Sequence, residues 1–251
     1  YLAKLGHSVT VFEALPEAGG MMRFGIPDYR LPKEILRAEI EEIEGVGVEI
    51  KTNTRVDSPE SLFDQGYNAI FLAIGAHQAI RLGVDGEDSP KVKGGISFLR
   101  DVSLGKEVEL GNRVAIIGGG NAAIDSARTA LRLGAKEVTI IYRRTRAEMP
   151  ASPEEIDGAL VEGVNIRFLA APVRIISQNK ELQLDCIGMK LGAVDASGRQ
   201  RPEPIKGSEF ATGFDTVIAA IGQRPEIPAQ FGLTTGRGNI IQVDSDTLAT
   251  T

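Results

Sequence analysis

Short apolar runs alternate with stretches of helical spacing along the chain, and many of these runs end at glycine. The run Val114–Ile117 leads into Gly118–Gly120, residues 121–133 then show helical spacing, and Val138–Tyr142 forms the next run. A short buried strand, a glycine turn, a helix and a second strand make up a β-α-β unit of about 30 residues. We therefore predict such a unit over residues 113–142.

Similar patterns predict further elements. We expect strands at residues 7–13, 47–50, 69–75, 165–169 and 216–222, and helices at 33–44 and 154–162. Residues 69–74 are all apolar, which is typical of a strand buried on both faces. Residues 91–111 show no strong period and are expected to be a connection. Residues 173–209 are expected to form an antiparallel hairpin with turns at Gly188, Gly192 and Gly198.

Composition narrows the class of protein. The 251 residues allow one large domain or two ordinary ones, and 42% hydrophobic with 25% charged residues is typical of a soluble globular protein. A net charge of −6 argues against a general nucleic-acid binder, and no apolar run approaches the roughly 18 residues of a membrane span. The single cysteine, Cys186, excludes an internal disulfide, a CxxC redox pair and a multi-cysteine metal site. With no signal peptide after Tyr1, we expect a cytoplasmic setting.

The glycine turn of the β-α-β unit is the strongest local signal for a ligand. In Gly118-x-Gly120-x-x-Ala123, the first glycine permits a tight turn, the second allows a pyrophosphate to approach the backbone, and the small third residue allows close packing of helix and strand. The helix N-terminus then offers N–H groups to the phosphates. We predict a dinucleotide site, the alternative being a turn that is only structural.

The end of the second strand of this unit indicates which dinucleotide is bound. A site for NAD usually has an acid there, which accepts a hydrogen bond from the ribose 2′-hydroxyl. This chain has Arg143 and Arg144 instead, and two guanidinium groups would attract the 2′-phosphate of NADP(H). The alternative is a solvated basic edge near Glu148.

The first strand of the chain ends in an acid, Glu13, at the equivalent place. Its carboxylate would accept from a ribose 2′-hydroxyl, as for the adenosine half of FAD or NAD. A glutamate at the end of a strand is usually just exposed, so this residue by itself decides little.

Four motifs in order resemble the NADPH-dependent glutamate synthase small (β) subunit and related iron–sulfur-coupled FAD/NADP oxidoreductases. The motifs are Glu13-Ala14-x-x-x-Ala18-Gly19-Gly20-Met21, Gly25-Ile26-Pro27-x-x-Arg30-Leu31-Pro32, Gly118-Gly119-Gly120-Asn121-x-x-x-Asp125-x-x-Arg128 and Tyr142-Arg143-Arg144-x-x-x-x-Met149-Pro150. The resemblance extends over essentially all 251 residues.

The resemblance implies an α/β fold with two Rossmann-like dinucleotide-binding domains of the three-layer ββα type. An NADP(H)-binding domain at residues 82–224 would be inserted in an FAD-binding domain at 1–81 and 225–251. The positions that match FAD-contacting residues are Glu13, Gly19, Gly20, Met21, Arg30 and Val56. Those that match NADP-contacting residues are Gly118, Gly119, Gly120, Asn121, Ala122, Arg143, Arg144, Ala220, Ile221 and Gly222. For Arg30, the alternative is a surface pair with Asp28.

The family's first strand and its glycine-rich loop for the FAD pyrophosphate would precede Tyr1, and its closing Gly-Asp strand and cysteine-rich iron–sulfur segment also lie outside these residues. We therefore expect a fragment of a longer protein that holds NADP(H) but holds FAD poorly. We assign no metal site and no acid or base catalyst within this chain.

The sequence thus predicts an NADPH-oxidising flavoprotein that passes electrons through FAD to iron–sulfur clusters outside this fragment. Its partners would be an iron–sulfur domain or subunit and a large catalytic subunit. The alternatives are a non-catalytic NADP(H)-sensing module or another FAD/NADP reductase. A flavin disulfide reductase is disfavoured because no cysteine pair exists.

Overall fold

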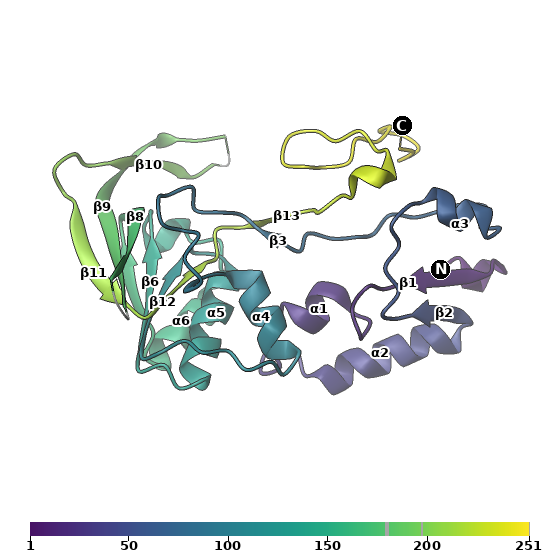
Figure 1. Ribbon diagram of the computed structural model, residues 1–251, viewed down its shortest axis with the longest axis horizontal. Coiled ribbons are helices and arrows are strands. Elements are labelled where there is room, and N and C mark those ends of the chain that lie inside the picture. Colours follow the sequence, from purple (N-terminus) through teal and green to yellow (C-terminus); the bar gives the residue numbers. More distant parts are fainter. Residues whose placement is uncertain (179–180, 197, 251) are drawn as a thin grey trace. The chain divides into compact units, whose positions relative to one another are not determined.

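The computed structural model describes residues 1–178, 181–196 and 198–250 (Figure 1). The chain divides into two compact units, one made of Tyr1–Gln78 and Arg224–Thr251 and the other of Ala79–Gln223. It passes between them through two short strands that pair with each other, β3 (Gln78–Ala79) and β13 (Gln223–Arg224). Each unit is described separately below.

The unit Ala79–Gln223 is built on a five-stranded parallel sheet with the order β4-β12-β5-β6-β7. Its strands are β4 (Val92–Gly94), β5 (Arg113–Ile117), β6 (Glu137–Tyr142), β7 (Asn165–Phe168) and β12 (Thr216–Ala219). The four residues of β12 and the last four of β5 are all buried, as expected for strands covered on both faces. The predicted β-α-β unit is confirmed by β5, β6 and the helix between them, α5 (Asn121–Arg132).

Three helices pack side by side on one face of this sheet: α4 (Gly95–Ser103), α5 and α6 (Pro153–Val161). The fully buried face of α5 carries Ala123, Ala127 and Ala130. Small side chains allow a helix to lie close to a sheet, so the glycine turn that precedes α5 is held tightly between helix and strands.

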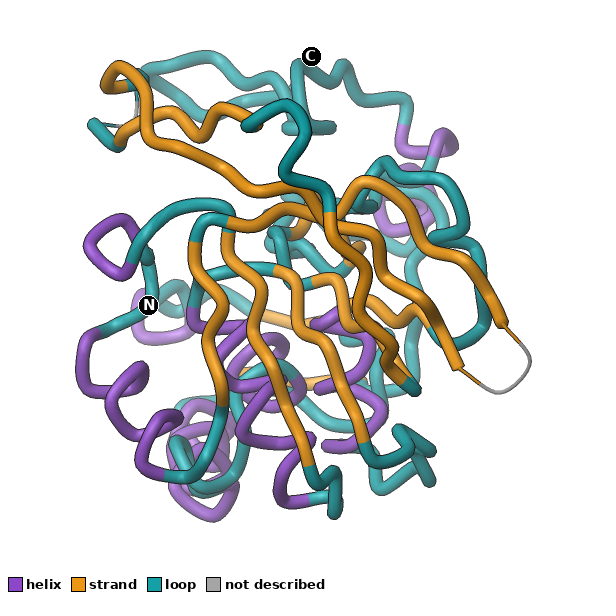
Figure 2. The backbone as a smooth tube through the Cα atoms, turned by 90° about the vertical axis from the view of Figure 1, so that its left-hand side faces the viewer, coloured by secondary structure: helices purple, strands orange, loops and turns teal. Residues whose placement is uncertain are grey.

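An antiparallel sheet covers the opposite face of the parallel sheet (Figure 2). It contains β8 (Ala170–Gln178), β9 (Glu181–Val194), β10 (Gln200–Pro204) and β11 (Phe210–Phe214), and β9 pairs with the other three. One apolar core joins the two sheets and includes Ile117, Val217, Leu184 and Cys186. Helices, parallel sheet and antiparallel sheet form the three-layer ββα arrangement, which confirms the predicted fold class.

Cys186 lies within that core, with no exposed surface, and burial raises the pKa of its thiol to about 12. A thiol of this kind stays protonated at neutral pH and is a poor nucleophile. Cys186 is therefore a packing residue.

Two predictions for this unit were wrong. Residues 91–111 are not a plain connection, because they contain β4 and α4. Two adjacent glycines are typical of a turn, but here Gly94 ends β4 and Gly95 begins α4. A Cβ at Gly95 would lie 3.0 Å from the Cβ of Ala220, so the glycine allows close packing at this point. Gly188 and Gly192 lie inside β9 rather than in turns, whereas Gly198 does lie in the turn between β9 and β10.

The other unit contains a two-stranded parallel sheet formed by β1 (Val9–Phe12) and β2 (Val48–Lys51). The helix α2 (Lys33–Gly45) connects these strands, which gives a second β-α-β arrangement. The short elements are α1 (Gly20–Phe24), α3 (Glu60–Asp64), and the 3-10 turns Ala3–Leu5 and Ala229–Phe231. None of the helices among the described residues has the length and apolar character needed to cross a membrane.

The strand predicted at residues 69–75 does not form in this structure. No described strand pairs with residues 69–74, and the side chain of Phe71 is 85% exposed. A strand requires a neighbour that accepts and donates its backbone hydrogen bonds, and the described residues provide none beside this run. The run is apolar, as a buried strand would be, but the sequence pattern does not show whether a neighbouring strand is present to pair with it.

A charge network holds α5 against α6. The carboxylate of Glu162 accepts hydrogen bonds at 2.6 Å from Arg128 Nη2 and from Arg132 Nη1, and Arg128 also pairs with Glu155. The hydrogen bonds from Arg132 and Arg128 lower the pKa of Glu162 to about 2 from its usual 4.5. The side chain of Glu162 is 28% exposed, so solvent screening limits what the network contributes to stability.

Glu162 should therefore make stability depend on acid pH. Because its pKa is lower in the folded protein, its contribution is complete above about pH 4.5 and is lost as the pH falls toward 2. We expect Glu162→Gln to reduce the free energy of unfolding at pH 7 by roughly 1 kcal/mol, as an exposed network does. Denaturant titrations of both proteins should converge between pH 4.5 and 2, whereas a pH-independent difference would contradict this assignment.

Candidate functional site

Three loops meet at the carboxyl edge of the parallel sheet in the unit Ala79–Gln223. Gly118–Gly120 follows β5, Arg143 and Arg144 follow β6, and Ala220–Gly222 follows β12. These strands are neighbours in the order β12-β5-β6, and the backbone joins them: Ala220 N donates to Ile117 O at 2.8 Å and Gly118 N to Ile141 O at 3.1 Å. The fold thus brings together the segments that the sequence assigned to NADP(H).

Two of the three turn glycines are required by the protein's own packing. Gly118 has φ +146°, and a Cβ there would lie 2.2 Å from the carbonyl oxygen of Ala220. A Cβ on Gly119 would lie 2.5 Å from a ring carbon of Tyr142. Real Cβ atoms do not approach so closely, so both glycines are needed to pack this turn against its neighbours.

The third glycine, Gly120, is different. Its φ of −92° and ψ of 177° suit any residue, and the nearest atom to a Cβ there would be Pro150 Cγ at 3.7 Å, an ordinary contact. Packing within the described protein therefore leaves room for a side chain at this position. Gly120 is the N-cap residue of α5, and the first N–H groups of a helix have no acceptor within it. A pyrophosphate that approaches the backbone at this point would explain the glycine.

The loop between β6 and α6 (residues 143–152), which we call the β6–α6 loop, lies against the glycine turn. Ala151 N donates to Gly119 O at 3.2 Å, and Ser152 N donates to Asn121 Oδ1 at 3.1 Å. The hydroxyl of Tyr142 donates to Glu148 O at 2.7 Å. Asn121, which the sequence assigned to the nucleotide, thus uses its amide oxygen to hold this loop.

Within the loop, the carboxylate of Glu148 is occupied locally. It accepts from Thr145 Oγ1 at 2.6 Å and from Thr145 N at 3.0 Å, and the hydroxyl is the main cause that lowers the pKa of Glu148. This is a capping box around the 3-10 turn Arg146–Glu148. Glu148 is therefore a structural acid that caps this turn.

The two arginines after β6 lie in different environments. Arg143 is exposed, as a phosphate-binding residue should be. Arg144 is only 4% exposed: its Nε donates to Gln200 O at 2.7 Å and its Nη2 to Asp195 Oδ2 at 2.8 Å. The expectation that both guanidinium groups face the 2′-phosphate therefore does not describe Arg144, because the turn between β9 and β10 provides it with buried partners.

The remaining NADP-assigned residues lie along the same edge. Ala122 is half-buried in the first turn of α5, Ala220 is buried, and Ile221 and Gly222 are exposed. Gly222 has φ +133°, which favours glycine. Ala220 contacts the glycine turn directly, whereas Ile221 is 43% exposed and free to contact a ligand.

The FAD-assigned residues lie in the other unit. Glu13 follows β1, and its Oε1 accepts from Leu15 N at 2.8 Å, which orients the carboxylate. Gly19 has φ +119°, and a Cβ there would lie 2.9 Å from Leu36 Cδ2, so this glycine serves packing against α2. Gly20 has φ +52° with no atom within 4 Å of a Cβ.

The loop after α1 is held by a lysine. Lys33 Nζ donates to Ile26 O at 2.5 Å and to Met22 O at 3.1 Å, and burial is the main cause that lowers its pKa. Asp28 accepts from Lys33 N at 3.1 Å. The FAD-assigned positions Met21, Arg30 and Val56 are half-buried in this unit.

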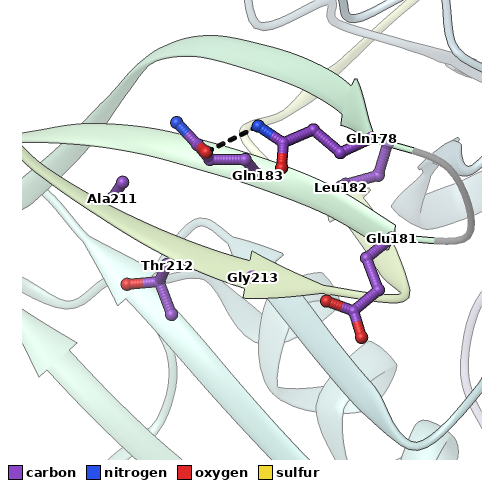
Figure 3. A pocket seen from close by; sticks show the side chains of 7 residues that line it. All are labelled: Gln178, Glu181, Leu182, Gln183, Ala211, Thr212 and Gly213. Atoms are coloured by element: carbon purple, nitrogen blue, oxygen red, sulfur yellow. Dashed lines mark hydrogen bonds between the residues drawn. The ribbon is translucent and has the colours of Figure 1, made fainter.

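A hollow of about 650 Å³ on the antiparallel sheet is a poor candidate for the site (Figure 3). It is lined by Gln178, Glu181, Gln183 and Thr212, with Gln178 Nε2 donating to Gln183 Oε1 at 2.8 Å. It has no glycine turn or helix N-terminus, and the carboxylate of Glu181 would repel a phosphate. Among the residues that the structure describes, no cluster of acids, histidines and cysteine could hold a metal ion.

Sequence reasoning missed several residues that shape the site. Tyr142 packs on Gly119, Pro150 is the nearest residue to Gly120, and Ser152 bonds to Asn121. Tyr142 and Pro150 belong to a recognised motif, but nothing in the motif says what they contact. The pair Thr145 and Glu148 has the spacing of a capping box, which could have been found.

The chain matches a family model described as pyridine nucleotide-disulphide oxidoreductase over residues 1–251. The NADPH-Fe(3+) oxidoreductase subunit beta of Geobacter sulfurreducens is 46% identical over 253 residues, which cover 96% of this chain and 38% of that protein. The NADP(+)-dependent formate dehydrogenase subunit beta of Moorella thermoacetica is 47% identical over 256 residues, covering 99% of this chain and 36% of that protein.

The glutamate synthase (NADPH) small chain of Escherichia coli is 36% identical over 239 residues, covering 89% of this chain and 51% of that protein. The resemblance to glutamate synthase small subunits is therefore confirmed, although the two relatives above share more identity. The chain spans about a third to a half of the length of these curated relatives.

Among solved structures, FprA of Mycobacterium tuberculosis in complex with NADPH matches with a TM-score of 0.74. The two are 22% identical, and the match covers 94% of this chain and 68% of that one. At this identity the likeness supports the fold alone.

Gly120 and Gly119 provide a matched pair of substitutions. Gly120→Ala and Gly120→Val should block the pyrophosphate while costing under about 1 kcal/mol at an N-cap position. Loss of charge-assisted backbone bonds should raise the Kd for NADPH about tenfold or more. Gly119→Ala should instead destabilise the fold, because its Cβ overlaps the Tyr142 ring. Calorimetric titration would measure the Kd for NADPH, and circular dichroism on the same samples would show whether the fold is kept. If Gly120→Val bound NADPH as tightly as the unmodified protein, the glycine turn would have only a structural role.

Proposed function

The chain belongs to the pyridine nucleotide-disulphide oxidoreductase family, and we propose that it binds NADP(H) and FAD within a flavoprotein that oxidises NADPH and passes the electrons to iron–sulfur clusters. The observation that carries the proposal is the glycine turn after β5. Gly118 and Gly119 are explained by packing, whereas Gly120 leaves open space at the start of α5. A cofactor pyrophosphate fits that space.

Arg143 supports NADP(H) as the nucleotide. It is exposed at the end of β6, where a family member that binds NAD usually has an acid. A guanidinium group there would form charge-assisted hydrogen bonds to a 2′-phosphate. Ala220, Ile221 and Gly222 at the end of β12 would line the same side of the cofactor.

Glu13 supports the assignment of FAD to the other unit. Leu15 N holds one carboxylate oxygen, and Oε2 is then oriented to accept from a ribose hydroxyl. The loops that contain Gly20, Met21 and Arg30 would follow the same cofactor.

The chemistry of hydride transfer belongs to the bound nicotinamide and flavin, and the chain contributes placement and electrostatics. The glycine turn would hold the pyrophosphate, and Arg143 would contact the 2′-phosphate, while the β6–α6 loop is bonded to the glycine turn. No side chain here is assigned to move a proton.

The electron acceptor and the partners belong to this proposal as well. The relatives are named as a subunit beta or a small chain, which supports assembly with at least one further subunit. Their names differ in the reaction of the whole enzyme, so we assign no glutamate product to this protein. We propose that the electron acceptor is a set of iron–sulfur clusters outside these residues. A cytoplasmic setting remains part of the proposal.

Anaerobic addition of NADPH tests whether the protein is catalytic. In the full-length protein, NADPH should bleach the visible absorbance of oxidised flavin within seconds, because hydride reaches the flavin directly. A protein that binds NADPH but leaves this absorbance unchanged would be a nucleotide-sensing module instead.

Arg143 should determine the preference for NADPH. Replacing it with Ala removes a charge-assisted contact worth roughly 1.5–3 kcal/mol, so the Kd for NADPH should rise about tenfold or more while that for NADH stays the same. Arg37→Ala, which removes an exposed arginine on α2 in the other unit, is the control. Equal losses for both nucleotides in titration calorimetry would show that Arg143 does not read the 2′-phosphate.

A further inference from the structure

The buried guanidinium of Arg144 is unused by the site as described above. It sits one residue after Arg143, yet its hydrogen bonds run to the turn between β9 and β10, at Asp195 and the carbonyl of Gln200. This inference rests on the proposed NADP(H) function and deepens it. We propose that Arg144 is a positioning residue, which ties the β6–α6 loop to the β9–β10 turn and so holds Arg143 toward the 2′-phosphate of NADP(H).

Three contacts fix Arg144, the residue that follows Arg143. The guanidinium of Arg144 is held by Asp195 and Gln200, and the carbonyl of Arg144 accepts from Leu169 N at 3.1 Å. Leu169 lies at the corner between β7 and β8 with φ +54°, a conformation that L-residues rarely adopt. Such a corner persists only where its surroundings hold it, so the parallel and antiparallel sheets are both fastened to Arg144.

Anchoring Arg144 also restrains its neighbour in the chain. Arg144 is buried while Arg143 is exposed, so the anchor fixes the backbone beside an arginine whose side chain lies in solvent. The other end of the β6–α6 loop is tied to the glycine turn through Ala151 and Ser152. Arg143 is thus attached to a loop that is fixed at both ends.

The chemistry of the pair suits an anchor better than a ligand for phosphate. Arg144 is 5% exposed at its side chain and Asp195 is 29% exposed, so the pair is largely shielded from water. To reach a phosphate, Arg144 would have to give up its hydrogen bonds to Asp195 and to the carbonyl of Gln200. A lysine could not replace it, because a single ammonium group lacks the planar fork that reaches a carboxylate and a carbonyl together.

Asp195 allows the two roles of Arg144 to be separated. If Arg144 is an anchor, Asp195→Ala should raise the Kd for NADPH about tenfold, the loss of one charge-assisted contact, and leave that for NADH within about twofold. Arg144→Ala should do the same, and the double variant should be no weaker than either single one. If Arg144 instead binds the phosphate, Asp195→Ala should leave NADPH affinity unchanged or improve it, which would overturn the proposal.

Asp185→Asn is the matched control. Asp185 is a carboxylate inside β9 that pairs with another arginine, Arg174, whereas Asp195 follows the end of β9. The control should leave the ratio of NADPH to NADH affinity unchanged. Circular dichroism of each variant shows whether the fold is kept, and the affinity ratio is a readout that a merely structural loss would not move.

Hydrogen exchange of the full chain without nucleotide separates this inference from the proposed function. In Asp195→Ala, the amide of Leu169 should exchange faster than in the unmodified protein, and it should not in Asp185→Asn. Unchanged exchange at Leu169 overturns the anchor whatever the nucleotide is. If exchange accelerates but the unmodified protein does not prefer NADPH over NADH, the anchor exists and the 2′-phosphate assignment fails.

Discussion

The carboxyl edge of the parallel sheet depends on a close approach of backbone to backbone. The turn after β5 passes so near Ala220 that no side chain fits at Gly118, and so near the Tyr142 ring that none fits at Gly119. These contacts hold the ends of three parallel strands together. The helix α5 begins directly after this turn, so the first N–H groups of the helix lie at the same edge of the sheet. Such groups can bind the phosphates of a dinucleotide.

The antiparallel sheet has two roles in this arrangement. Its apolar face, with Leu184 and Cys186, completes the core on the side of the parallel sheet that the helices leave uncovered. Its β9–β10 turn supplies Asp195, whose carboxylate binds the buried guanidinium of Arg144. A layer that appears to serve only packing is therefore connected to the loop that carries Arg143.

The relatives of this chain differ in their overall reactions but share one nucleotide. Relatives with 46% and 47% identity are parts of enzymes named for different overall reactions, and the chain covers little more than a third of either. What these names share is the use of NADP(H). The glycine turn and Arg143 are the features of this chain that we propose for the binding of NADP(H).

The sequence by itself determined the elements whose pattern is local. The strands β5, β6 and β12, the helix α5 and the glycine turn follow from apolar runs and turn residues that are adjacent in the chain, and the motif order indicated the family. Tertiary structure decided what depends on distant partners. Residues 69–74 have the composition of a strand, but none of the described strands pairs with them. Gly188 and Gly192 lie in a strand because β9 pairs with β8, β10 and β11. The side chains of Arg143 and Arg144 differ in exposure because the β9–β10 turn, distant in sequence, places Asp195 beside only one of them.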